Sequence, residues 1–142
     1  MKKIRKKEII KRLREIEDSL VVLEENLPSN LEGFEKMGLV KDGIYKRIEF
    51  IIENIISISN ILNSDLSLGI PSDEDSIIKN LEDKKIISGK LSEKIILMKG
   101  FRNILVHRYG NINDGQAFEN IKENLNDFET FKKEILEFIN RN

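Results

Sequence analysis

The chain has 142 residues, with 24 Lys or Arg against 25 Asp or Glu and a formal net charge of −1. This length suits one domain over residues 1–142, and the 39% of hydrophobic residues predicts a globular protein rather than a disordered one. Cysteine is absent, which excludes disulfides, thiolate metal sites and cysteine nucleophiles. A single histidine argues against a zinc site, so we expect neither a metal nor a cofactor.

The basic residues are concentrated at the start of the chain. Residues 1–14 hold eight Lys or Arg and one Glu, a net charge of +7, which leaves −8 for the rest. Such a segment suits a phosphate-backbone partner, although an ordinary solvated helix face gives the same pattern. No apolar run exceeds four residues. We therefore expect no signal peptide, no contact with a membrane, and a cytoplasmic location.

The first predicted helix carries apolar residues at alternating steps of four and three, a seam that packs against another helix. Proline ends this helix at Pro28, because it lacks the amide donor and disfavours helix in the residue before it. A capping box from Ser29 to Glu32 predicts a short helical turn, which Gly38 closes. The seam consists of Ile9, Leu13, Ile16, Leu20, Leu23 and Leu27.

A second long helix is predicted over residues 42–62, and its wide isoleucine face predicts a central position. That face contains Ile44, Ile48, Ile51, Ile52, Ile55, Ile56, Ile58, Ile61 and Leu62. The break at Gly69-Ile-Pro71 follows. Ser72, with Asp73, Glu74 and Asp75, then places a cap and acidic charge at the start of a short third helix. Its predicted buried face is Ile77, Ile78 and Leu81.

Two further helices complete the pattern, over residues 90–107 and 116–140, with a loop at 109–115 between them. Their inward faces are Leu91, Ile95, Met98, Phe101 and Leu105 in one, and Phe118, Ile121, Leu125, Phe128, Ile135 and Phe138 in the other. Strand-like alternation is not sustained anywhere. The pattern predicts an all-α protein, an antiparallel bundle of four to five helices of which four are long.

One segment, residues 99–110, concentrates the chemistry-bearing side chains. It holds the only histidine, His107, and one of two tyrosines, Tyr109, together with Lys99 and Arg102. Arginine is a planar, permanent cation suited to phosphate, and histidine exchanges protons near neutral pH. This pair suffices for metal-free phosphodiester chemistry, although a lone histidine is more often structural.

Helical geometry separates these groups. Residues five apart differ by about 140° around a helix, whereas residues seven apart lie within about 20°. Arg102 and Tyr109 therefore share a face that His107 does not. A cleft between two protomers brings such groups together more easily than one helix does, which predicts a homodimer with two copies of the segment lining one groove.

The string G-F-R-N-I-L-V-H-x-Y at residues 100–109 resembles the R-x4-H-x-Y motif of the HepT-like branch of the HEPN superfamily. The resemblance covers nearly the whole chain, including the isoleucine-rich second helix and the closing amphipathic helix. Members of that branch are small all-α prokaryotic proteins. They are usually the toxin half of a toxin–antitoxin pair whose partner is a minimal nucleotidyltransferase, MntA.

The resemblance implies a role for each motif residue. Arg102 and His107 match the pair used in metal-independent RNA cleavage, in which a ribose 2′-hydroxyl attacks the adjacent phosphate. Asn103 matches a polar residue that contacts phosphate or positions the site. Lys99 lies outside the motif, and we expect it to support RNA binding because it is a cation close to these residues in the sequence. Tyr109 matches the tyrosine that the nucleotidyltransferase AMPylates, which blocks the groove with bulk and negative charge.

Two other hypotheses stay open. In the first, the protein is a non-catalytic helical partner or substrate of the nucleotidyltransferase. In the second, it is a plain dimerisation module in which Arg102 and His107 satisfy a buried carboxylate. On the second reading Tyr109 is a packed ring and Asn103 a solvated surface residue.

Overall fold

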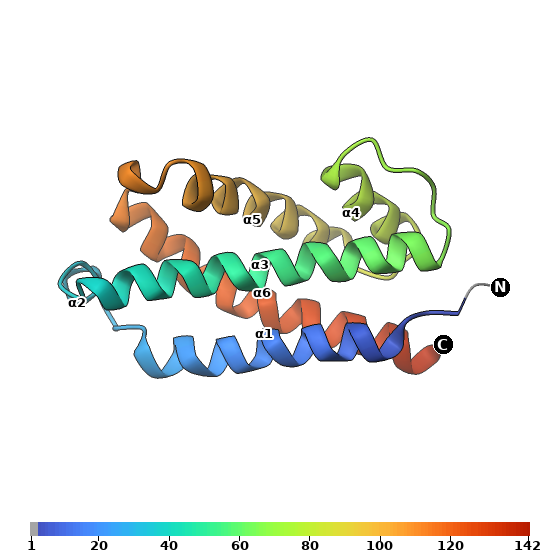
Figure 1. The fold of residues 1–142 in the computed structure, drawn as a ribbon, viewed down its shortest axis with the longest axis horizontal. Helices are drawn as coiled ribbons and strands as arrows, with labels where there is room; N and C mark the ends of the chain where they lie inside the picture. Colours follow the sequence, from blue (N-terminus) through green and yellow to red (C-terminus); the bar gives the residue numbers. More distant parts are fainter. Residues whose placement is uncertain (1–2) are drawn as a thin grey trace.

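Four long helices form an antiparallel bundle, in which α1 and α5 run in one direction and α3 and α6 in the other (Figure 1). The computed structural model describes residues 3–142; Met1 and Lys2, part of the predicted basic segment, lie outside the described residues. Across the described residues the secondary structure is entirely helical. The elements are α1 (Lys6–Asn26), α2 (Leu31–Glu35), α3 (Leu39–Asp65), α4 (Glu74–Asp83), α5 (Gly89–His107), the 3-10 turn η1 (Tyr109–Asn111) and α6 (Asp114–Arg141). The predicted all-α bundle is confirmed.

The connection from α1 to α3 differs from the prediction in two details. α1 ends at Asn26, before Pro28, as predicted. The N-cap of α2 is Asn30 rather than Ser29, because the Asn30 side chain accepts a hydrogen bond from the Gly33 amide at 2.8 Å. Gly38 does not close α2: it has φ +60°, a conformation that glycine adopts without strain, and it precedes the first residue of α3.

The start of α4 is also shifted by one residue from the prediction. Its N-cap is Asp73 rather than Ser72: the Asp73 carboxylate accepts from the Ser76 amide at 2.8 Å, and the Asp73 amide donates to Ser76 Oγ at 3.2 Å. These reciprocal bonds form a capping box. Glu74 and Asp75 therefore lie in the first turn without taking part in the cap.

The predicted loop before the last helix is shorter than expected. η1 occupies its first half, and α6 begins at Asp114 because the Asn113 side chain caps it, accepting from the Gln116 amide at 3.0 Å. α5 begins one residue before the predicted start, with Ser88 as its N-cap.

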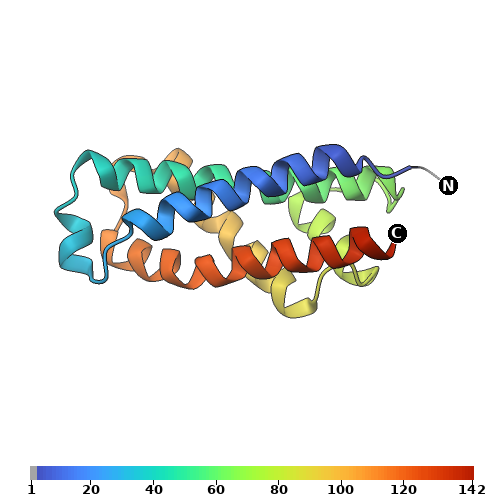
Figure 2. The same cartoon turned by 90° about the horizontal axis from the view of Figure 1, so that it is seen from below.

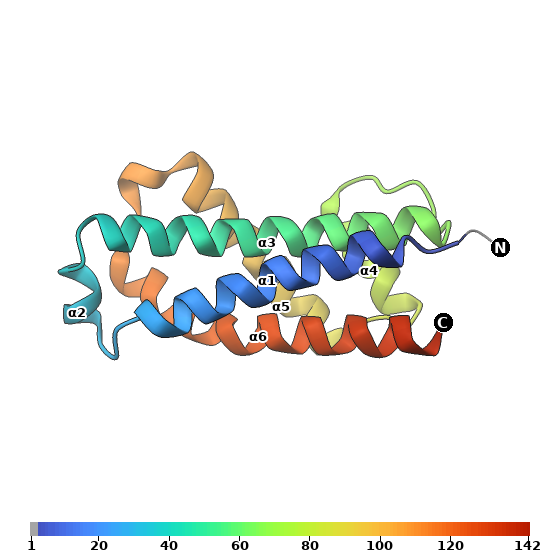
Figure 3. The ribbon, with the colours of Figure 1, turned by 60° about the horizontal axis from the view of Figure 1, so that its bottom comes forward.

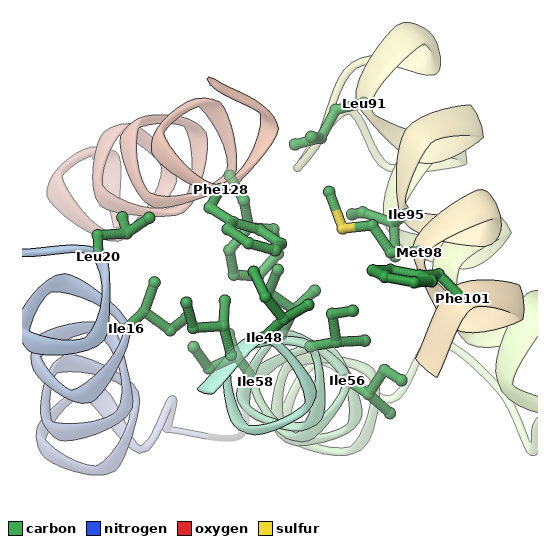
Figure 4. Packing of buried hydrophobic residues seen from close by; sticks show 14 of the residues in the cluster. Ile16, Leu20, Ile48, Ile56, Ile58, Leu91, Ile95, Met98, Phe101 and Phe128 are labelled. Carbon is green, nitrogen blue, oxygen red and sulfur yellow. The ribbon is translucent and has the colours of Figure 1, made fainter. Parts of the chain in front are cut away.

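The core lies around α3, which packs against α1, α4, α5 and α6 (Figures 2 and 3). Ile16 and Leu20 of α1, Phe128 of α6 and Met98 of α5 converge on its isoleucine face (Figure 4). The predicted apolar positions are buried, except that Leu27, Leu125 and Phe138 are half-buried. Within residues 3–142, no helix combines the length and apolar character needed to cross a membrane.

Candidate functional site

Arg102 is held between two carboxylates that come from two other helices. Its Nη1 donates to Glu53 Oε1 of α3 at 3.0 Å, and its Nη2 donates to Glu74 Oε1 of α4 at 2.7 Å. The Arg102 side chain is only 11% exposed. Burial acts to lower the pKa of Arg102, but the bonds to Glu74 and Glu53 outweigh it and raise that pKa above its ordinary value. The Arg102 guanidinium is thus a permanent cation, held in place by Glu53 and Glu74 and largely shielded from solvent.

Lys99, about one helical turn before Arg102, is engaged in the same way. Its Nζ forms an ion pair with Asp75 and lies 3.9 Å from Glu74 Oε1, and its side chain is 13% exposed. We call Glu53, Glu74 and Asp75 the acidic clamp. α4 lies beside α5 and the C-terminal half of α3 (Figure 1), so its first turn reaches both cations of α5.

Tyr109 lies just beyond the end of α5, at the start of η1, and it also faces α3. Its hydroxyl donates a hydrogen bond to Asp42, and its ring packs edge-on against Tyr45, with centroids 6.2 Å apart and an interplanar angle of 89°. Burial and the hydrogen bond to Asp42 raise the pKa of Tyr109 to about 12. Tyr109 is 45% exposed, so its ring is accessible from solvent.

Beneath Tyr109, the buried Tyr45 belongs to a partly buried polar network with Asp114 and Lys41. The Tyr45 hydroxyl donates to Asp114 Oδ1 at 2.5 Å, and Lys41 Nζ lies 2.6 Å from Asp114 Oδ2. Burial and the bond to Asp114 raise the pKa of Tyr45. Burial acts to raise the pKa of Asp114, but Lys41 and Tyr45 outweigh it and lower that pKa. The network ties the N-terminal part of α3 to the first turn of α6.

A pocket of about 430 Å³ opens beside this network, and it is lined by Asp42, Tyr45, Lys46, Glu49, Leu105, Val106 and Tyr109.

His107 is the last residue of α5, and its side chain is exposed. Asn103 is exposed too and lies four residues before it, so the two are neighbours on one helix face. Arg102 faces α3 and α4 instead. Within one chain the structure does not bring Arg102 and His107 together, in keeping with their five-residue spacing.

Arg102 and Tyr109 both contact α3, the relationship that their seven-residue spacing predicts, yet they occupy separate places along it. Their partners Glu53 and Asp42 are eleven residues apart on α3, which corresponds to about 16 Å. Neither carboxylate was expected from the sequence, nor was Tyr45. In the part of the chain that the structure describes, no three His, Cys, Asp or Glu side chains are grouped to hold a metal ion.

Comparison with known proteins assigns the family. The sequence model of the family described as Ribonuclease HepT-like matches residues 7–135. The chain therefore belongs to the HepT-like ribonuclease family. The predicted resemblance is confirmed, and the matched region contains Arg102, His107 and Tyr109.

Several relatives of this HepT-like chain agree in sequence or fold. It is 30% identical over 98 residues to the mRNA nuclease HepT of Shewanella oneidensis, a stretch that covers 69% of this chain and 74% of the relative. It superposes with a TM-score of 0.81 and 26% identity on the tri-AMPylated Shewanella oneidensis HEPN toxin, solved in complex with an MNT antitoxin, over 89% of this chain and 95% of that one. The cytosolic protein YutE of Bacillus subtilis, of unknown function, shares the fold, with a TM-score of 0.84 at 19% identity over 98% of this chain and 93% of that one.

Proposed function

We propose that the chain is a toxin-type endoribonuclease that needs no metal ion and is neutralised when a nucleotidyltransferase transfers AMP to Tyr109. The observation that carries the proposal is the family match over residues 7–135, which contains the whole R-x4-H-x-Y motif. The AMPylated Shewanella oneidensis toxin in complex with its antitoxin supports the proposed neutralisation by AMP transfer.

The proposed reaction uses groups of the chain and the RNA alone. The ribose 2′-oxygen forms a bond to the adjacent phosphorus while the bond to the 5′-oxygen breaks, leaving a cyclic phosphate and a 5′-hydroxyl. His107 takes the proton from the 2′-hydroxyl or gives one to the departing 5′-oxygen. Arg102 stabilises the negative charge that gathers on the phosphoryl oxygens, with Lys99 and Asn103 as supporting contacts.

A second copy of the chain supplies what one protomer lacks. One His107 serves only one of the two proton transfers, so we assign the other to His107 of a second copy. α5 carries a surface suited to this pairing, because Leu97, Gly100, Ile104 and His107 lie within about 80° around the helix. Leu97 and Ile104 are exposed apolar side chains, and a Cβ placed on Gly100 has no atom within 4 Å apart from its chain neighbours and the backbone of its own helix. Two copies of α5 that pack along this stripe and cross near its C-terminal end put both copies of His107 at one groove.

The geometry of Tyr109 suits modification. Its oxygen would form a bond to the α-phosphorus of ATP as pyrophosphate leaves, and the hydroxyl proton departs to Asp42 or water. The exposed ring edge permits access, and the hydrogen bond to Asp42 fixes the oxygen. The added phosphate brings negative charge to the last residue of the motif, two residues after His107, and this charge repels RNA.

The acidic clamp favours a second candidate, a non-catalytic partner of the nucleotidyltransferase. Arg102 is already paired with Glu53 and Glu74, so it has a role without RNA. These carboxylates are exposed by 39% to 50%, and His107 bonds to neither, so the reading in which Arg102 and His107 satisfy one buried carboxylate is not what the structure shows.

RNA cleavage by the purified, unmodified chain in EDTA separates the two candidates. The nuclease loses about 10²- to 10⁴-fold in rate on His107→Ala. The non-catalytic partner shows no histidine-dependent cleavage on broad RNA pools, yet accepts AMP in a reaction that Tyr109→Phe abolishes. Cleavage that EDTA stops would contradict metal independence.

A further inference from the structure

We infer that the acidic clamp occupies the phosphate-binding position of Arg102 and Lys99, so that RNA must displace Glu74 and Asp75 before it reaches these cations. The inference rests on the proposed function for its ligand, RNA. It adds a regulating role for three carboxylates to which neither the motif nor the family comparison gives a role.

The exposure of the charged groups is the first argument. Arg102 and Lys99 are 11% and 13% exposed, whereas the carboxylates of Glu53, Glu74 and Asp75 are 39% to 51% exposed. An approaching polyanion therefore meets the carboxylates first. Two cations face three carboxylates, which leaves one net negative charge on the cluster. In this state the cluster repels a phosphate rather than attracting it.

The hydrogen-bond geometry is the second argument. A phosphate binds a guanidinium best by accepting two parallel N–H bonds from it. In the structure the two terminal nitrogens of Arg102 each donate to a different carboxylate, Glu53 and Glu74. A phosphate that accepts two parallel N–H bonds from Arg102 must therefore replace at least one of the bonds to Glu53 and Glu74.

Glu74 and Asp75 are the replaceable members. Both are surface side chains of the first turn of α4, and the capping box there belongs to Asp73 and Ser76. Rotation of either side chain into solvent therefore leaves the helix start intact. Their own contacts run to Arg102 and Lys99, so the clamp opens by side-chain movement alone.

A positioning role makes the opposite prediction. If Glu74 serves to orient Arg102 for RNA, then weakening this pair lowers RNA affinity. If Glu74 competes with RNA, the same change raises it. Glu74→Gln is the discriminating variant, because its amide oxygen still accepts a hydrogen bond from Arg102 while the negative charge is gone.

The test measures the affinity of the unmodified full chain for a fluorescein-labelled single-stranded RNA by anisotropy. Removing one partly exposed carboxylate is expected to tighten binding about fivefold, and Glu74→Gln with Asp75→Asn more than about tenfold. Asp83→Asn is the matched control, because it removes one exposed charge from the other end of α4, about 13 Å away, and is expected to change affinity less than twofold. The advantage of Glu74→Gln must shrink as salt rises from about 0.1 M to about 0.3 M, since salt screens the repulsion.

A second readout separates this inference from the proposed function. Inorganic pyrophosphate is titrated into wild type and Glu74→Gln while the Arg102 Nε–H signal is followed by NMR. Tighter pyrophosphate and RNA binding by Glu74→Gln, with no RNA cleavage by any variant, supports the clamp and overturns the nuclease. Cleavage by wild type with equal or weaker RNA binding by a folded Glu74→Gln overturns the clamp and leaves the nuclease. If Glu74→Gln binds neither RNA nor pyrophosphate more tightly than wild type, the clamp is refuted whatever the cleavage assay shows.

Discussion

The hydroxyl of Tyr109 donates a hydrogen bond to Asp42, a residue 67 positions earlier in the chain. This bond fixes the side chain that we propose as the AMP acceptor, and it holds the proton on the acceptor oxygen. The oxygen to be modified is thus well placed, but at neutral pH it remains a neutral phenol.

The pKa of Tyr109 gives the first prediction. It is about 12 in the folded chain, against about 10 in an unfolded one. Between pH 10 and 12 the unfolded state loses this proton while the folded state keeps it, so stability present below pH 10 is lost across that window. We expect wild type to lose stability more steeply there than Tyr109→Phe, measured by urea unfolding at a series of pH values. Parallel curves for the two proteins would show that the raised pKa is incorrect.

The hydrogen bond from Tyr45 to Asp114, which parallels the bond from Tyr109 to Asp42, gives the second prediction. Tyr45 is 2% exposed, and its hydroxyl donates to Asp114. Tyr45→Phe leaves Asp114 with only its Lys41 contact, so we expect a loss of about 1–3 kcal/mol in the free energy of unfolding. Urea unfolding at neutral pH measures it. Tyr109→Phe, at a half-exposed position, serves as the control and is expected to cost less; equal losses would contradict the special role of the Tyr45 network.

Most of the fold follows from the period of its apolar residues. Isoleucines spaced along residues 44–61 indicate a central helix, and α3 buries that face. The helix starts are less determined, because Ser29 and Asn30 are both good caps, as are Ser72 and Asp73. Which of two adjacent caps is used depends on the path of the incoming chain, and local sequence does not report it.

The sequence predicts the candidate residues of α5 and η1, but not the residues of other helices that they contact. The seven-residue spacing predicts a shared face for Arg102 and Tyr109, and both contact α3, although α5 ends at His107 and Tyr109 lies in η1. The partners Asp42 and Glu53 depend on how α3 and α5 pack, which no local pattern encodes. Glu74 had a sufficient explanation as a favourable charge at a helix start, so its contact with Arg102 appeared only in three dimensions.

The third prediction contrasts the two proposed catalytic side chains. His107 is exposed, so His107→Ala is expected to change the free energy of unfolding by less than about 0.5 kcal/mol while it removes RNA cleavage. Arg102→Ala removes cleavage too, but it also leaves Glu53 and Glu74 without their shared cation, at a cost of about 1 kcal/mol. Thermal melting and the EDTA cleavage assay are run on both variants. Retained cleavage in a folded His107→Ala protein would exclude the proposed proton transfer.

The fourth prediction tests the proposed pairing of two chains along α5. A glutamate in place of Leu97 or Ile104 puts a charge on the apolar stripe, and burying an unpaired charge in an interface is costly. We expect wild type to scatter light as a dimer, twice the 16.5 kDa chain mass, and Ile104→Glu to scatter as a monomer with unchanged helix content. Ile70→Glu is the matched control, because Ile70 is fully exposed on the loop before α4 and lies outside the stripe.

Cleavage assays on the same proteins connect assembly with chemistry. If two copies of His107 share the proton transfers, a monomeric Ile104→Glu protein loses cleavage although its own Arg102 and His107 are intact. Mixed dimers with one His107→Ala subunit should then retain well under half of the wild-type rate, because each site needs both histidines. A monomer with full activity, or mixed dimers at half activity, would show instead that each chain cleaves RNA with a single histidine.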